Sequence, residues 1–501
     1  MVANAFPPYG VAGVYRPFRF VKHLSKTGWC TRVITANPYC YERYDPDLLD
    51  SVPSETEIIR VRGRDPWQAI QRWREQRIYK SLSGGSAGIA DRIRAAHSRP
   101  LRSMIRRMIQ AAAACYYQPD GEKRWIGPAV EATVKLCARK RPNVIWATAS
   151  PLSAWIVAQR ASAITGVPYV LDLRDPIGLS YYEPDLKQPE WVKRRTKRLM
   201  YQLFKGAQSV VFLFDSVAES YYRVFPGALD VPKVYIIPNG YDGTISEFAP
   251  TTGDKFTVLY AGTVTSYQYD TLLQALALFK NADPGKANAL RFRFVGECMD
   301  DLAQQAAMLG LSDIVVTSGP TSHAEITRLE READALLVLG RLPSIKGHEL
   351  FAGAKTFNYL KANRPILGVL PQDETRKILN QAGVSTIADA GSPADIVLNL
   401  RTLLNAWSQG ILSSLVPDPI KCELYSAERQ IEALGRALEG LPPVEPFVPG
   451  MAEIPPSLRD ELKMTNGNFD PDPPHRYSIG KAKTLRRADS DRNKSAESYR
   501  S

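Results

Sequence analysis

Two hydrophobic periodicities alternate along the chain. Stretches in which apolar residues recur every three or four positions, such as AVEATVKLCARKRP, are separated by short runs rich in valine and isoleucine, such as NVIWATAS and VPYVLDL. The first pattern predicts amphipathic helices, and the second predicts strands that are buried on both faces. Because helices alternate with buried strands, we expect parallel sheets covered by helices on both faces, the doubly wound α/β class.

This alternation runs twice. A first series of strands and helices ends with the strand KVYIIPNG, and a second series begins with KFTVLYAGT. We therefore predict one Rossmann-like domain over residues 1–240 and a second over 241–424, followed by a terminal helix over 425–440. Residues 441–501 are rich in proline, serine and charged side chains and bury too little apolar surface to offset their chain entropy, which predicts a disordered tail.

The stretch FPPYGVAGVYRPFRFVKHL follows a short predicted strand at residues 1–6. Its prolines and glycines predict a loop, and the apolar residues from Val14 onward predict a helix. Free N–H groups at a helix N-terminus beside a glycine turn suit an anion or a sugar, so Gly10, Gly13 and Arg16 are candidates for an acceptor-binding or phosphate-binding loop. A turn without a ligand is the alternative.

Composition narrows the classes of protein that need to be considered. The 501 residues are 44% hydrophobic, with no run of 18 apolar residues and no basic stretch leading into an apolar one, so neither a membrane span nor a secretory signal is expected. The six cysteines form no C-x-x-C pair, and none of the five histidines has metal-ligand spacing. We expect reduced thiols in a cytoplasmic protein and no metal site.

The formal net charge of +12 adds a question about partners. Part of it lies in a predicted basic helical insertion over about residues 65–125, where arginines alternate with aromatic and aliphatic residues, as in WQAIQRWREQRIYK. Such a helix either contacts an anionic membrane surface, which would place the protein at the inner membrane face, or packs on its own domain. Nucleic acid is not expected, because no nucleic-acid-binding motif accompanies the charge.

Two predicted strand–helix junctions carry residues suited to chemistry. The strand VLDLRDP delivers Arg174 and Asp175 at its carboxyl end, where ligands collect in parallel sheets. Arg174 suits a phosphate there while a carboxylate accepts sugar hydroxyls; the alternative is a structural Arg–Asp pair. In GAKTFNYLKANRPIL, Gly353 and Lys355 begin a predicted helix, which suits a pyrophosphate, and Asn358 one turn later suits a ribose or sugar hydroxyl. An ordinary helix with an exposed lysine is the alternative.

Five stretches, in this order, resemble a known family. They are FPPYGVAGVYR, VLDLRDP, VYIIPNGYD, LYAGTVTSY and GAKTFNYLKANRPILGVL. Set in two alternating domains, they are similar to retaining glycosyltransferases of the GT-B fold, family four (glycosyl transferases group 1), and to its sub-branch with an RDP motif. The resemblance extends from Met1 to about Gly440.

The resemblance implies an enzyme that moves a sugar from a nucleotide diphosphate sugar to a glycan or lipid-linked acceptor, in polysaccharide or glycoconjugate biosynthesis. It implies retention of configuration without a metal or another cofactor. The first domain would face the acceptor, the second would bind the donor, and the terminal helix would cross back to the first domain. The implied catalytic residues are Arg174 and Asp175. The implied donor-binding residues are Gly262, Thr263, Glu349, Gly353, Lys355 and Asn358.

The chain also departs from the family pattern. Asn358 stands where the second of two paired glutamates is expected and Leu350 where the first is expected, with Glu349 adjacent. No lysine or arginine follows Gly262 in TVTSYQYD, where the family usually has a basic pair, and Arg174 replaces a frequent histidine. Two alternatives therefore stay open: a non-catalytic nucleotide-binding or assembly protein on the same fold, and a nucleotide-sugar epimerase.

Overall fold

The computed structural model describes most of the chain. The described residues are 1–38, 44–63, 118–177, 190–251, 253–265, 267–297, 299–342 and 347–452. They belong to one compact unit, Met1–Leu462, whereas the unit Lys463–Ser501 lies outside them. Most of the predicted basic insertion and most of the predicted tail also lie outside the described residues.

The first half of the unit is built on parallel strands. They are β1 (Arg32–Ala36), β2 (Glu57–Val61), β3 (Ile145–Ala149), β4 (Tyr169–Leu173), β5 (Ser209–Phe212) and β6 (Val234–Ile236). β1 pairs with β2, and β3 to β6 pair in sequence order. In place of the strand expected at residues 1–6, Val2 alone bridges Ile34 of β1 and Ala147 of β3, because the prolines at positions 7 and 8 end the extended segment.

Helices cover both faces of this sheet, as the alternation of buried side chains requires. They are α1 (Ala12–Lys26), α2 (Pro46–Asp50), α6 (Lys123–Arg139), α7 (Ser153–Thr165), α8 (Glu190–Gly206) and α9 (Asp215–Val224), with the 3-10 turn η2 (Val231–Lys233). On β3 and β4, Trp146 and Val170 pack against α1, while Ala147 and Leu171 join the core formed with α6 and α7. Adjacent residues thus face opposite layers, as the period of two in a strand dictates.

The second half repeats the architecture. Its parallel sheet has the order β12–β11–β10–β7–β8–β9, with β7 (Phe256–Ala261), β8 (Leu290–Val295), β9 (Val315–Ser318), β10 (Ala335–Leu339), β11 (Ile366–Leu370) and β12 (Ile387–Asp389). β7 pairs with β8 on one side and β10 on the other, so the strand order reverses between β7 and β10. Ligands of open α/β sheets bind at such a switch point, outside the carboxyl ends of the strands.

Helices of the second half follow its strands in turn. They are α10 (Asp270–Ala282), α11 (Pro284–Asn288), α12 (Asp300–Met308), α13 (His323–Glu332), α14 (Ala354–Ala362), α15 (Glu374–Gln381), α16 (Pro393–Ser408) and α17 (Pro419–Cys422), with the 3-10 turns η3 (His348–Leu350), η4 (Leu412–Leu415) and η5 (Glu423–Tyr425). Within the described ranges, no helix is long and apolar enough to cross a membrane. The predicted fold class, two doubly wound parallel α/β domains, is confirmed.

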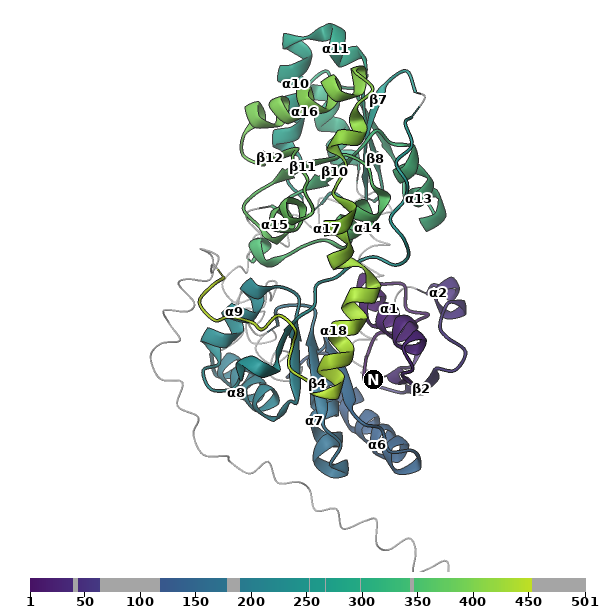
Figure 1. Cartoon of the computed structure of the whole chain (residues 1–501), viewed down its shortest axis with the longest axis vertical. Helices are drawn as coiled ribbons and strands as arrows, with labels where there is room; N and C mark the ends of the chain where they lie inside the picture. The colour runs from purple at the N-terminus through teal and green to yellow at the C-terminus, as the bar shows by residue number, and fades with distance from the viewer. Residues whose placement is uncertain are drawn as a thin grey trace, which may run out of the picture. The chain divides into compact units, whose positions relative to one another are not determined.

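The last helix, α18 (Ala427–Glu439), packs on the first half (Figure 1). Its residues Ile431 and Leu434 are buried with Phe20 of α1 and Trp146 of β3. The Ser426 side chain caps its N-terminus by accepting a hydrogen bond from the Arg429 amide, and Gly440 ends it in the left-handed conformation. The terminal helix of the chain therefore contributes to the core of the first sheet.

A buried ion pair fixes the N-terminal end of α1 against the sheet. Arg16 Nη2 lies 2.8 Å from Asp172 Oδ1 at the end of β4, and both side chains are almost fully buried. The Arg16 guanidinium also donates to the carbonyl oxygens of Ile237 and Pro238, and Thr148 donates to Asp172. Each charge is thus surrounded by hydrogen-bond partners, which is the condition under which a buried pair is tolerated.

Asp172→Asn should destabilise the protein strongly, because it leaves the buried Arg16 charge without its counter-charge. We expect the free energy of unfolding to fall by about 3–5 kcal/mol in urea denaturation. The control is Asp230→Asn, which removes an exposed ion pair with Lys233 and should change that free energy by less than about 1 kcal/mol. Equal small effects of the two substitutions would contradict this role of Asp172.

Candidate functional site

A cleft of about 460 Å³ lies between the two halves of the unit. The first half contributes the start of α1, the residues that follow β4 and the start of α9 to its lining, and the second half contributes Arg341 and residues 350–354. Of the predicted site residues, it is lined by Gly13, Arg16, Arg174 and Asp175. The cleft therefore joins the carboxyl edges of parallel strands, where the sequence analysis expected ligands.

Arg174 connects two loops of the cleft. Its guanidinium donates to the carbonyl oxygens of Gly13 and Ser150, and its Nε lies 3.6 Å from Asp175 Oδ2. The same Nε is buried without a hydrogen-bond partner. Arg174 thus holds the loops in place, as the structural interpretation of VLDLRDP expects, and its role in ligand binding stays a prediction.

Gly13 is required by the close approach of Arg174. A Cβ atom at Gly13 would lie 2.3 Å from Arg174 Nη1, far inside van der Waals contact. The N-cap of α1, Val11, provides no side-chain cap, and the first turn holds no acidic residue, so the helix N-terminus stays electropositive. Arg16, in contrast, is fully engaged with Asp172 and backbone carbonyls.

A second, smaller cavity lies at the switch point of the second sheet. With a volume of about 10 Å³ it has room for one water molecule, and its lining includes Tyr267, Arg341, Gly353, Lys355 and Asp373. It shares Arg341 and a neighbouring phenylalanine with the larger cleft. The two cavities are therefore adjacent, and Arg341 lies where they meet.

The Lys355 amine has no ion-pair partner among the described residues. Its Nζ is buried without a hydrogen-bond partner, 3.8 Å from the centroid of the Tyr260 ring and 4.9 Å from that of Tyr267. Burial lowers the pKa of this amine to about 7. Gly262, with φ of +135°, allows the amine to approach, because a Cβ atom there would lie 2.7 Å from Nζ.

Lys355 also lies in the first turn of α14, whose N-terminus is open. Its N-cap, Gly353, provides no side-chain cap, and no acidic residue occupies the first turn. The first amide N–H groups of a helix have no intrahelical acceptor and carry the positive end of the helix dipole. An amine beside such amides is the combination that suits an anion such as a phosphate.

Arg341 is a residue that the sequence analysis missed. It follows β10, and its guanidinium lies 3.5 Å from the centroid of the Phe351 ring, with Nε buried and without a hydrogen-bond partner. Within the described ranges, no carboxylate forms an ion pair with it. Its position directly after the apolar strand DALLVLG was the available signal, but one arginine after a strand forms no pattern.

A buried carboxyl group completes the smaller cavity. Asp373 is 4% exposed and accepts a hydrogen bond from the Arg376 amide at the start of α15. Burial is the main reason that the pKa of Asp373 is raised to about 7. The net charge of this cavity therefore changes near neutral pH.

Four of the predicted residues are placed elsewhere. Thr263 and Asn358 are exposed, whereas Gly10 and Glu349 are partly buried. Gly10, Thr263, Glu349 and Asn358, all in the described part of the chain, lie outside the linings of both cavities. The structure therefore brings together Gly353 and Lys355 around one cavity and Gly13, Arg16, Arg174 and Asp175 around the other. Gly262 lines neither cavity and lies against the Lys355 amine.

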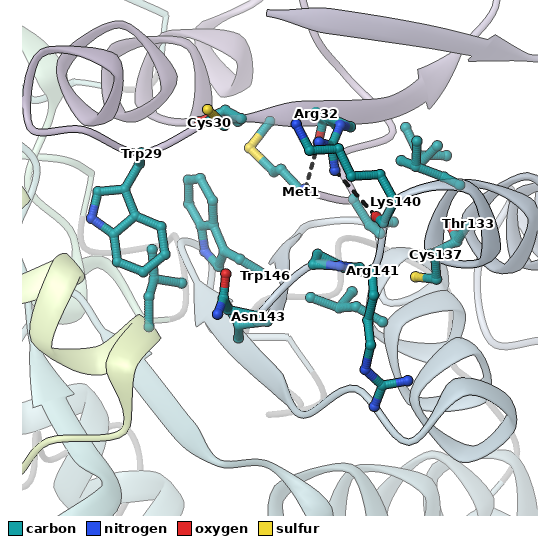
Figure 2. Close-up of a pocket in the computed structure, with 18 of the residues that line it drawn as sticks. Met1, Trp29, Cys30, Arg32, Thr133, Cys137, Lys140, Arg141, Asn143 and Trp146 are labelled. Carbon is teal, nitrogen blue, oxygen red and sulfur yellow. Dashed lines mark hydrogen bonds between the residues drawn. The ribbon is translucent and has the colours of Figure 1, made fainter.

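A further cavity of about 320 Å³ lies at the opposite, amino-terminal edge of the first sheet (Figure 2). Figure 2 shows Trp29 and Trp146 on one side of it and Arg141 on the other. None of the predicted site residues lines this cavity. Within the described ranges, no group of three or more histidine, cysteine, aspartate or glutamate side chains is placed to hold a metal ion.

Comparison with known proteins finds a similarity in the first half. Residues 19–240 match the family profile of the glycosyl transferase 4-like domain. These residues are therefore similar to the glycosyl transferase 4-like domain. The prediction that the chain is a glycosyltransferase is confirmed. A search of curated proteins finds no match.

Solved structures were compared with the chain as well. Sucrose-phosphate synthase from Thermosynechococcus elongatus is 10% identical, with a TM-score of 0.52 over 87% of this chain and 98% of that one. WaaG, a glycosyltransferase involved in lipopolysaccharide biosynthesis, is 14% identical, with a TM-score of 0.47 over 85% and 99%. The first similarity shows a shared fold, which confirms the predicted GT-B architecture.

TarM from S. aureus, solved with fondaparinux, alpha-GlcNAc-glycerol and UDP, is 11% identical, with a TM-score of 0.42 over 62% of this chain. This chain spans 59% of the length of that one.

Gly13→Ala should displace the Arg174 guanidinium from its two carbonyl acceptors. We expect the free energy of unfolding to fall by about 1.5–3 kcal/mol, the size of a hydrogen bond to a charged group. The control Gly127→Ala in α6, where a Cβ meets no atom within 4 Å, should stabilise the protein by up to about 1 kcal/mol.

A double-mutant cycle with Arg174→Ala tests the cause. If the clash with Arg174 is the reason, the effect of Gly13→Ala disappears once that side chain is removed. Additive effects of the two substitutions would show that Gly13 is needed for another reason.

Proposed function

We propose that this glycosyltransferase moves a sugar from a nucleotide diphosphate sugar to a glycan or lipid-linked acceptor, with retention of configuration and without a metal ion. The observation that carries the proposal is the unpartnered Lys355 amine at the open N-terminus of α14. A diphosphate placed there would receive hydrogen bonds from the helix amides and a charge-assisted bond from the amine. The cleft would then hold the sugar and the acceptor.

Energetics support a binding role for Lys355. A buried charge without a partner opposes folding, and the lowered pKa of the amine reports this opposition. Neither Tyr260 nor Tyr267 neutralises the charge, although their rings attract it. A residue that destabilises the free protein and lies in a cavity is a candidate for function, since a bound anion would relieve this cost while the amine keeps its proton.

The reaction requires stabilisation of the departing nucleotide diphosphate. Preorganised N–H groups and cations aimed at developing charge are usually the largest contribution to such catalysis, and α14 with Lys355 supplies both. Across the cleft, Asp175 offers a carboxylate to sugar hydroxyls, and Arg174 keeps Nε free for a polar group. We assign the acceptor proton to the departing phosphate itself, which accounts for retention without a protein nucleophile.

One observation favours a second candidate, a nucleotide-binding protein without transferase activity. Asn358 is exposed and lines neither of the two cavities, so this position supplies no side chain to the proposed donor site. Release of free nucleotide diphosphate from a nucleotide sugar distinguishes the two functions. Turnover supports the transferase, and tight binding without any turnover supports the second candidate.

Lys355→Met should separate binding from stability. Methionine keeps the length of the side chain and packs well beside aromatic rings, so we expect the free energy of unfolding at pH 7 to rise by about 1–3 kcal/mol. Nucleotide diphosphate binding, measured by calorimetry, should be lost.

The control is Lys361→Met in the last turn of the same helix, which should leave binding unchanged. Unchanged affinity of Lys355→Met would remove Lys355 from the site.

Nucleotide diphosphate affinity should fall as the pH rises from 7 to 9. Above pH 7 the free site loses the positive charge of Lys355 and gains the negative charge of Asp373, because both pKa values lie at about 7. Both changes oppose an anion, so binding must take up protons, and affinity should fall by about tenfold per pH unit for each proton. The ligand itself does not contribute to this pH dependence, since its terminal phosphate has a pKa of about 6 and is already ionised.

Titration calorimetry at pH 7, 8 and 9 in two buffers of different ionisation enthalpy measures this proton uptake. Constant affinity over the range would contradict it.

A further inference from the structure

We infer that Arg341 binds the phosphate that carries the sugar and forms with Lys355 a two-cation clamp for the diphosphate. The inference rests on the proposed function, since it names a residue for the leaving group of that reaction. It gives Arg341 a catalytic role, stabilisation of the charge that develops when the bond between sugar and phosphate breaks.

The position of Arg341 determines which phosphate it reaches. Lys355 lines only the smaller cavity, whereas Arg341 lines both that cavity and the cleft. Arg174 and Asp175 line the cleft from the opposite half, where an acceptor would lie. A diphosphate that extends from Lys355 towards the cleft would therefore place its sugar-bearing phosphate beside Arg341.

The guanidinium is preorganised but not neutralised. It stacks on Phe351 at 3.5 Å, and the Phe351 carbonyl in turn accepts a hydrogen bond of 3.1 Å from Thr375. Stacking orients the planar group without using its N–H donors, and its Nε remains buried and without a hydrogen-bond partner. Arginine and carboxylate or phosphate groups form paired hydrogen bonds, so this donor is suited to a phosphate oxygen.

Arg341 is one of two cations near the switch point of the second sheet. The loop after β7 carries no lysine or arginine between Gly262 and Asp270. The cations of this cavity come instead from α14 and from the residue after β10, which is adjacent to β7 in the sheet. Lys355 approaches Gly262 so closely that its amine occupies the space beside the β7 loop. The two cations beside the β7 loop therefore belong to other elements, α14 and the residue after β10.

The experiment compares nucleoside monophosphates with diphosphates. Titration calorimetry with UMP and UDP, GMP and GDP, and dTMP and dTDP first identifies the base that the wild-type protein prefers. Arg341→Gln should weaken the diphosphate by about 10–100-fold, the size of a hydrogen bond to a charged group, and leave the monophosphate within about threefold. Lys355→Met should weaken both ligands. Arg341→Lys, which keeps the charge, should retain part of the preference for the diphosphate.

Two further variants separate charge from packing. Arg401→Gln removes another arginine that stacks on a phenylalanine, Phe279, and should leave both affinities unchanged. Thr263→Arg introduces a cation at an exposed position next to Gly262. In the Arg341→Gln background, this substitution should recover part of the diphosphate affinity. A purely structural Arg341 would not be rescued in this way.

The outcomes distinguish the inference from the proposed function. If the wild-type protein binds diphosphates and a folded Arg341→Gln variant binds them equally well, the inference is wrong and the proposed function stands. Equal weakening of mono- and diphosphates by Arg341→Gln would also overturn it, because Arg341 would then not be specific to the second phosphate. If the wild-type protein binds no nucleotide of the panel, both the inference and the proposed function fail.

Discussion

The buried ion pair of Arg16 and Asp172 is the constraint on which the first half's side of the cleft depends. It joins the first helix, the carboxyl end of β4 and the segment that follows β6, because Arg16 also donates to the carbonyl oxygens of Ile237 and Pro238. Arg174, two residues after Asp172, is brought against Gly13 by the same arrangement. The loops that surround the cleft therefore take their positions from a pair of charges that has no contact left for a ligand, and binding falls to the residues beside it.

The second half shows the opposite condition: two of its cations have no ion-pair partner among the described residues. Lys355 and Arg341 rest on aromatic rings, which orient them without neutralising them. Such groups oppose folding in the free protein, and a bound anion would stabilise them. The two halves of the unit thus differ: charges with partners build the first half's side of the cleft, and charges without partners form the proposed diphosphate site in the second half.

Much of the fold was predictable because buried parallel strands are continuous apolar stretches in the sequence. NVIWATAS contains β3 and VPYVLDL contains β4, and AKTFNYLKAN contains α14, whose Gly353 and Lys355 mark a helix start in the sequence itself. The remainder depends on tertiary contacts that no local pattern encodes. Arg341 became visible only when β10 was placed beside β7, and the exposure of Asn358 depends on which face of α14 is buried. Val2 could not be foreseen as a one-residue bridge, since its partners β1 and β3 lie far apart along the chain.

The central claim, that the open end of α14 binds a nucleotide diphosphate, is tested most directly by a crystal structure of the protein with the diphosphate that it binds best. The account predicts phosphate oxygens within about 3.2 Å of Lys355 Nζ and of the first amides of α14. A nucleotide bound elsewhere, for example in the cavity of Trp29 and Trp146, with Lys355 still enclosed by Tyr260 and Tyr267, would contradict it.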